Sequence, residues 1–146
     1  MSRWGVASPL ALPAAYNPTG DVACPAATRT VIIAAAGVVA QDVGNYYPFL
    51  VCSLAILLGA TPPTALSIDF GIGAGSAVDT YTLPPAILVA NATVIPHFAL
   101  VGANSATQWT NPGATINVNL TPTGQAVTLK QVGSRAVVAL FRGPDA

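Results

Sequence analysis

The sequence carries very little charge. Its 146 residues include five basic and five acidic side chains, with no glutamate and a single lysine, so charged residues make up only 7% of the chain. A soluble domain usually carries about 25%. A disordered chain needs low hydrophobicity or high net charge, whereas this one is 53% hydrophobic with a net charge of zero. Five scattered cations do not neutralise a track of phosphates, so we expect no binding to nucleic acid.

Residues for catalysis or metal binding are equally scarce. His97 is the only histidine, and we expect it to be a partly buried structural residue between Pro96 and Phe98. The two cysteines are too few for a disulfide scaffold or a zinc site. We expect Cys52 to be buried in a strand and Cys24 to lie in a loop, and a bridge between them stays open. The sequence therefore predicts no enzyme, no metal and no cofactor.

No apolar run is long enough for a membrane-spanning helix, which needs about 20 residues. The best candidates, Phe49 to Leu58 and Val31 to Ala40, are ten residues each, and glycine or proline bounds or interrupts both. Pro9 and Pro13 likewise break the leading stretch that could imitate a secretory signal. We expect neither a membrane span nor a signal peptide.

Proline dominates the first part of the chain. Residues 1–28 show no periodic apolar pattern and contain four prolines, namely Pro9, Pro13, Pro18 and Pro25. This pattern predicts an extended arm over residues 1–28, followed by a folded domain over 29–146. Because proline lowers the entropy of a free arm, fixing such an arm along a neighbour costs less than fixing a flexible linker.

From residue 29 onward, β-branched runs are separated by Gly, Pro or Asn about every ten residues, which is typical of short strands. We expect strands over 29–36, 48–58, 65–71, 79–83, 86–90, 93–101, 106–110, 114–120, 125–131 and 135–141. Good helix formers are few. The fold class expected is therefore all-β, an antiparallel β-sandwich of jelly-roll type with the extended N-terminal arm.

The clearest local unit lies near the C-terminus. Ile116, Val118 and Leu120 alternate with polar residues, which predicts a strand with one apolar and one polar face. Pro122-Thr123-Gly124 then predicts a hairpin turn, and Gly133-Ser134 predicts the next chain reversal.

Several expected strands are apolar on both faces, although an antiparallel sandwich normally alternates between core and water. They lie at 31–36, 49–51 with 54–58, 86–90 and 136–141. We infer that one sheet face is buried against further copies of the chain or a larger assembly. Alternatively, the arm and loops of the same chain cover these strands. The residues expected in such contacts are Pro9, Pro13, Tyr16, Pro18, Ile32, Leu50, Leu88, Val138 and Leu140.

Three further patterns invite a chemical interpretation. The loop 71–75 is glycine-rich but lacks the G-x-G-x-x-G spacing of a phosphate site, so we interpret it as a flexible connection. Asp69 and Asp79 flank this loop, but too few polar residues surround them for an acid–base pair. Trp109 and Tyr46-Tyr47 could form an aromatic platform for sugars, although such residues more often seal a core or an interface.

The proline-rich arm, the many-stranded body, the scarcity of charge and the lack of a catalytic set together resemble the decoration, or cement, proteins of tailed-bacteriophage capsids. The resemblance covers the whole chain at the level of organisation. It implies a non-enzymatic homo-oligomer, expected to be a trimer, that binds the major capsid protein on the outer surface of the virion after assembly in the host cytoplasm. The alternative is a trimeric jelly-roll binding module, lectin-like or receptor-binding, with its site in the loops around Tyr46, Gly73 and Trp109.

Overall fold

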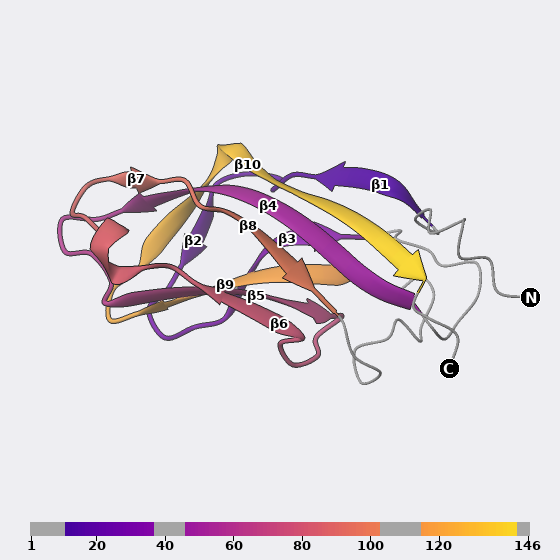
Figure 1. Ribbon diagram of the computed structural model, residues 1–146. Helices are drawn as coiled ribbons and strands as arrows, with labels where there is room; N and C mark the ends of the chain where they lie inside the picture. The colour runs from indigo at the N-terminus through magenta and orange to yellow at the C-terminus, as the bar shows by residue number, and fades with distance from the viewer. Residues whose placement is uncertain (1–10, 37–45, 103–114, 143–146) are drawn as a thin grey trace, which may run out of the picture.

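Two antiparallel sheets packed face to face form the body of the molecule in the computed structural model (Figure 1), which describes residues 11–36, 46–102 and 115–142. The six-stranded sheet contains β1 (Ala11–Tyr16), β2 (Val22–Cys24), β4 (Tyr46–Leu58), β7 (Thr93–Val94), β8 (His97–Val101) and β10 (Val127–Arg142). The four-stranded sheet contains β3 (Thr30–Ala35), β5 (Ala65–Ile72), β6 (Asp79–Thr82) and β9 (Ile116–Thr123). The predicted all-β, jelly-roll-like sandwich is confirmed.

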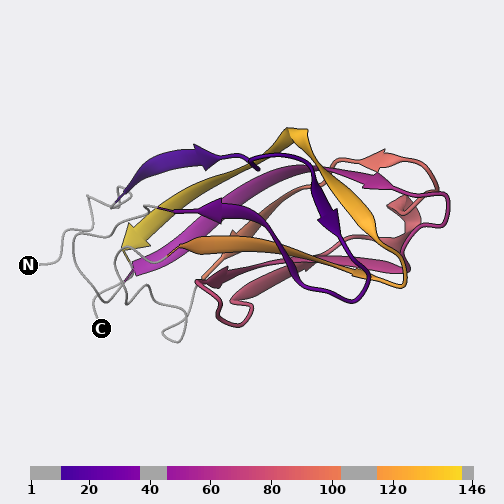
Figure 2. The ribbon, with the colours of Figure 1, turned by 180° about the vertical axis from the view of Figure 1, so that it is seen from behind.

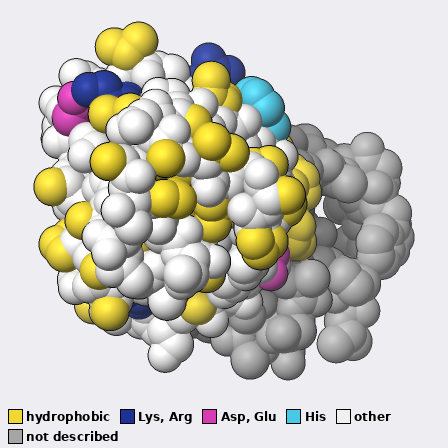
Figure 3. Space-filling model, turned by 90° about the vertical axis from the view of Figure 1, so that its left-hand side faces the viewer, with side chains coloured by type: hydrophobic (Ala, Val, Ile, Leu, Met, Phe, Trp, Pro, Cys, Tyr) yellow, Lys and Arg dark blue, Asp and Glu magenta, His cyan; other side chains and the backbone are white. Residues whose placement is uncertain are grey.

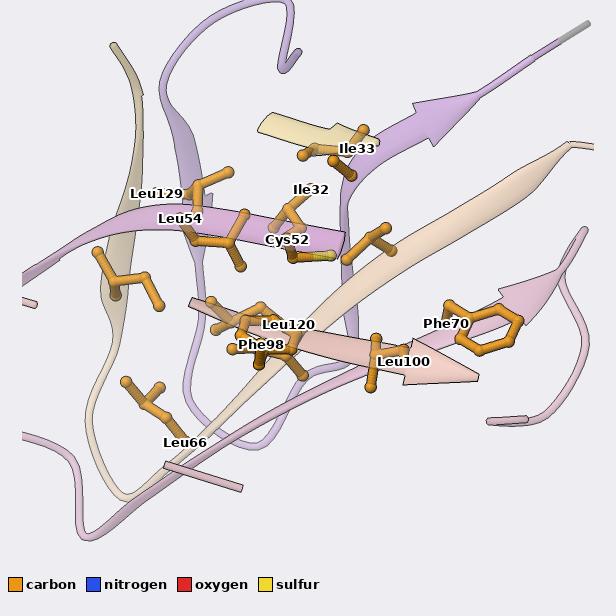
Figure 4. Close-up of a cluster of buried hydrophobic side chains, with 14 of the residues drawn as sticks. Ile32, Ile33, Cys52, Leu54, Leu66, Phe70, Phe98, Leu100, Leu120 and Leu129 are labelled. Carbon is orange, nitrogen blue, oxygen red and sulfur yellow. The ribbon is translucent and has the colours of Figure 1, made fainter. Parts of the chain in front are cut away.

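The core lies between the two sheets, where alternate residues of each strand meet (Figure 4). Leu54 of β4, Phe70 of β5 and Leu120 of β9 are fully buried there. The rings of Tyr81 and Phe98 stack with centroids 4.5 Å apart and join β6 to β8. Each large buried side chain contributes roughly 1.5–3 kcal/mol, so this layer supplies most of the force that holds the sheets together.

The predicted boundary between arm and domain is wrong from residue 11 onward. β1 pairs with β10 from Ala11 opposite Leu140 to Tyr16 opposite Ala136, and β2 pairs with β10 further along. Figure 2 shows these leading strands, in indigo, at the edge of the six-stranded sheet. β10 is 16 residues long, and its open edge needs partners for its backbone groups. An edge strand also tolerates proline, so Pro13 does not prevent pairing. Residues 1–10 lie outside the described residues.

The predicted hairpin around Pro122-Thr123-Gly124 is also wrong. A turn is present and Gly124 has the left-handed φ of 91° expected of it, but β9 and β10 belong to different sheets. The turn therefore carries the chain across the sandwich. Turn residues predict a change of direction, and which sheet receives the next strand is decided by core packing.

Gly133-Ser134 does not reverse the chain either. The register between β10 and β4 shifts between Lys130 and Arg135, so these residues form a bulge inside one long strand. Gly133 has a φ of 90°, and the Ala55 N–H donates to the Ser134 hydroxyl oxygen at 2.9 Å. The bulge is held by β4, which explains why the strand continues beyond it.

The strand expected over 86–90 is replaced by a short 3-10 helix, η2 (Pro85–Ile87). Pro84 and Pro85 lack backbone N–H groups, which opposes strand pairing at this point. The strand expected over 93–101 is divided into β7 and β8, and the Pro96 carbonyl between them accepts from the Leu54 N–H at 3.2 Å. The strand expected over 106–110 lies outside the described residues. Within the described part of the chain, no helix is long and apolar enough to cross a membrane.

Candidate functional site

The outer face of the six-stranded sheet carries apolar side chains where water-facing residues would normally be polar. The strand register aligns Ala15, Val137, Val51 and Ala99 in one row across β1, β10, β4 and β8. Val51 is 48% exposed, Ala15 and Ala99 are exposed, and Val137 is half-buried. We call this row, together with the flanking Phe49 and Val101, the apolar face. β1 extends the edge of this sheet by pairing with β10.

Two of the predicted contact residues, Leu50 and Val138, lie on the inner side of β4 and β10, the strands that carry the apolar face. Ile32, Leu50, Leu88 and Val138 are buried in the core of the chain itself, which argues against contact with a partner. A run that is apolar at both parities does not tell which parity faces inward. The neighbours of opposite parity, such as Val51 beside Leu50, are the exposed ones.

The described contact residues expected in the leading segment lie against the chain's own fold. Tyr16 is half-buried and packs against the core, and Pro18 is buried. Both are held by the chain's own sheet and cannot serve as the tip of a reaching arm. Pro9 and the side chains of Pro13 and Leu140 lie outside the described residues.

A second exposed apolar region covers the end of the sandwich near η2 and β7. Ile87, Val89 and Ile95 lie there, with Val89 56% exposed and Ile95 55% exposed. Figure 3 looks at this end and shows hydrophobic side chains spread across it, with charged side chains mainly toward the rim. We call these three residues the end patch.

The outer face of the four-stranded sheet carries a network of hydrogen-bonded polar side chains. The Arg29 guanidinium donates to the Asp69 carboxylate from Nε and Nη2, with Nη2 2.5 Å from Oδ1, and its Nη1 donates to the Gly75 carbonyl at 2.9 Å. The Asn119 amide donates to Asp69 Oδ1 at 3.1 Å. The hydrogen bond to Asp69 raises the pKa of Arg29 above its ordinary value. This network fastens the glycine-rich loop over the sheet.

Asp69 and Asp79 do not form a pair. Asp69 lies opposite Thr80, and Asp79 lies opposite Phe70, so the two carboxylates point to opposite faces of the sheet. Asp79 accepts from the backbone N–H groups of Thr80 and Val101, each at 2.9 Å, which ties β6 to β8. Both carboxylates therefore hold structural hydrogen bonds.

Gly71 lies under the fastened loop and has no room for a side chain. A Cβ at this position would come within 2.7 Å of the Gly75 carbonyl oxygen and 3.0 Å of Arg29 Nη2. We expect Gly71→Ala to lower the free energy of unfolding by about 1–3 kcal/mol, because the backbone must shift. Gly20→Ala is the matched control, since nothing lies within 4 Å of its Cβ, and it should change stability by less than about 0.5 kcal/mol. Urea denaturation measures both, and equal effects would contradict this prediction.

Both cysteines are buried and free. Cys52 lies in β4 as predicted, but Cys24 lies in β2 and not in a loop. Burial raises the pKa of both thiols, that of Cys52 to about 12. The thiols remain protonated at neutral pH and behave as small hydrophobic residues.

The buried Cys52 thiol predicts a loss of stability in alkali. Its pKa is about 12 in the folded chain against an ordinary value of 9.0, so the folded state holds the proton more tightly. The stability that the protonated Cys52 thiol contributes is complete below pH 9 and is lost as the pH rises toward 12. The free energy of unfolding should then fall by up to about 1.4 kcal/mol per pH unit. Urea denaturation at successive pH values should show a smaller fall for Cys52→Ala, and identical slopes would contradict this assignment.

His97 is exposed on β8 and is not the partly buried residue that the sequence suggested. It lies next to Ser53 of β4, which in turn lies next to Arg135 of β10. These three side chains line a hollow of about 410 Å³ together with Asn17 and Gln131. The hollow adjoins the apolar face, two residues along each strand.

The remaining expectations concern metals and aromatic platforms. Within the described residues, no group of three or more His, Cys, Asp or Glu side chains is placed to hold a metal ion. Trp109 and the side chains of Tyr46 and Tyr47 lie outside the described residues. Gly73 lies in the loop after β5 with a φ of 60°, and its N–H donates to the Thr115 carbonyl at 2.6 Å.

No protein-family model matches the chain, and no curated protein matches it in sequence. Solved structures share its architecture. The VP2 subviral particle of infectious bursal disease virus has a TM-score of 0.48 at 12% identity. That match covers 92% of this chain but only 38% of the VP2 chain. The xylan-binding module CBM15 has a TM-score of 0.49 at 8% identity, covering 90% of this chain and 99% of that one. The Eiger TNF from S. frugiperda has a TM-score of 0.44 at 11% identity. That match covers 95% of this chain and 97% of the Eiger chain. The likeness concerns the fold alone.

Proposed function

We propose that the protein is a non-enzymatic structural protein of a virion, which decorates and stabilises the capsid as a homo-oligomer. A trimer is the specific expectation, with the major capsid protein as partner and the outer capsid surface as location. The observation that supports this proposal is the apolar face. Its Val51 and Val101 side chains are 48% and 38% exposed.

Self-association through the apolar face follows from the energetics of burial. Apolar surface removed from water contributes roughly 25 cal/mol per Å². A stable interface buries about 800 Å² on each partner. Val51, Ala99 and Val137 are small or β-branched and stand in register, so two such faces can pack closely without loss of much side-chain entropy. Second copies of this chain are therefore the occupants that we assign to the apolar face.

The end patch is the surface that we assign to the capsid. It lies where the chain leaves η2 and β7, and it exposes Val89 and Ile95 to a neighbour. An oligomer presents several copies of this patch at once. Several weak contacts then add to a firm attachment through their effective concentration.

Co-sedimentation with capsid shells tests the proposal. Shells of the virus that encodes the chain, prepared without this protein, should bring the unchanged chain into the pellet. The double variant Val89→Asp with Ile95→Asp should remain an oligomer and stay in the supernatant. The control is Val132→Asp, which charges another valine that is 86% exposed on the bulge and should still bind.

Failure of the unchanged protein to bind shells would contradict the capsid role. Retention of an oligomer that captures glycans from an array, with loss of capture in Trp109→Ala, would instead favour the binding module of the same fold. Shell binding and glycan capture are measured on the same purified protein in two separate experiments.

A further inference from the structure

We propose that the hollow beside His97 is a binding site for an oxyanion, that is, a carboxylate, sulfate or phosphate group. The described lining belongs to one chain, and it lies beside the apolar face on the same side of the sheet. The hollow measures about 410 Å³ and opens on the outer face of the six-stranded sheet. Its described lining has no acidic side chain.

The uncompensated charge of Arg135 supports the assignment. Among the described basic side chains, Arg29 is paired with Asp69 and Lys130 is paired with Asp21. Arg135 has no carboxylate partner within the described residues. A guanidinium offers planar, fork-like donors that match an oxyanion.

The order of three side chains across β10, β4 and β8 creates the hollow. Arg135, Ser53 and His97 are neighbours across three strands, so the short Ser53 side chain stands between two long ones. Adjacent strands are about 4.8 Å apart, which places the backbones of Arg135 and His97 about 10 Å apart. That gap admits one oxyanion between the guanidinium and the imidazole, with the Ser53 hydroxyl beneath it. An imidazole donates an N–H in either protonation state.

The bulge in β10 shapes the rim of the hollow. Gly133, with its left-handed φ, lets the strand bend outward, and Ser134 anchors the bend to the Ala55 N–H. Gln131 lies on the bulge and Asn17 follows β1, and both add amide donors to the lining. The Asp21 carboxylate accepts from the Gln131 N–H, and its pairing with Lys130 lowers its pKa and balances its charge. Bulges commonly redirect side chains at binding sites.

The lining distinguishes the class of ligand. Among its described residues there is no Trp, Tyr or Phe, so a neutral sugar would lack the broad stacking surface that such ligands use. A donor-rich hollow with an unpaired cation selects a negatively charged group. Both a free inorganic oxyanion and an acidic sugar carry this group.

Titration of the ¹⁵N-labelled full chain with sodium sulfate, D-glucuronate and D-glucose tests the site. Sulfate or glucuronate should shift the backbone amide signals of Ser53, His97 and Arg135 in a saturable manner, and glucose should not. Tighter binding of glucuronate would identify an acidic sugar, and tighter binding of sulfate would identify an inorganic oxyanion. Potassium chloride at matched ionic strength controls for screening.

Variants decide whether the named residues form the site. Arg135→Gln should weaken binding about tenfold or more, since it removes a charge-assisted bond. His97→Gln should weaken it less, because an amide can still donate. The control is the double variant Lys130→Gln with Asp21→Asn, which removes a cation of the same strand together with its own partner and should leave affinity within about twofold. Absence of saturable shifts in the unchanged chain, or equal weakening by this control and by Arg135→Gln, would overturn the proposal.

Discussion

The double variant Val51→Asp with Val101→Asp is expected to be a folded single chain. Both side chains lie on the outer face of the six-stranded sheet, where Val51 is 48% and Val101 is 38% exposed, so the core does not depend on them. In the oligomer, each aspartate would be buried without a partner. An unpaired buried charge costs several kcal/mol, which corresponds to a dissociation constant at least about a hundredfold higher.

Analytical ultracentrifugation of this variant gives the readout, and circular dichroism shows that it remains folded. The matched control is Val132→Asp, since Val132 is an exposed valine of the same sheet outside the apolar face. This control should keep the oligomeric state of the unchanged protein. If the double variant associates as strongly as the control, the apolar face is not the interface.

Asp69→Ala is expected to destabilise the fold strongly. The carboxylate is 5% exposed and accepts from Arg29 and from Asn119, which lies on the neighbouring strand. Its removal leaves a guanidinium and a buried amide without their partner. We expect a loss of about 2–3 kcal/mol, below that of a fully buried pair because Arg29 remains partly in contact with water. The midpoint of thermal unfolding should fall by roughly 6–12 °C.

Asp69→Asn is the matched control for this substitution. It keeps the shape of the side chain and an acceptor oxygen for Arg29. It should therefore lower the free energy of unfolding by about half as much as Asp69→Ala. A double-mutant cycle with Arg29→Gln isolates the coupling between the two side chains, which should exceed about 1 kcal/mol. Coupling near zero would show that the network does not hold the loop after β5 in place.

The fold class could be predicted from composition and strand punctuation. The alternation at Ile116, Val118 and Leu120 marked the inner face of β9 correctly, because polar residues stand between them. The connections could not be predicted in the same way. Pro122-Thr123-Gly124 indicates a turn, but only core packing decides that the turn joins two sheets. Gly133 marked a left-handed position, and the sequence did not distinguish a bulge from a reversal.

The apolar runs by themselves did not indicate which face of the strands is exposed, and the expected contact residues Leu50 and Val138 lie on the buried face. Leu50 and Val51 are equally apolar, so neither residue alone reveals which one faces the core. A signal was present two residues further along each strand. Ser53 and Arg135 are polar and must face outward, and they share parity with Val51 and Val137. Polar residues at even spacing from an apolar run therefore indicate its exposed side.

The leading segment shows why local composition misleads. Its prolines predict an extended chain, and the segment is extended where the structure describes it, but as the edge strands β1 and β2. The 16-residue β10 supplies the pairing partner, and it lies more than a hundred residues away in the sequence. Pairing over such a distance cannot be inferred from the composition of either segment.

The most direct test of self-association is the molar mass of the unchanged protein, measured by sedimentation equilibrium over a wide range of concentrations. If the apolar face is an interface between copies, the mass will be a multiple of the 14.7 kDa chain, three times that value for the proposed trimer. A mass of one chain at the highest concentration attainable would contradict the proposed assembly.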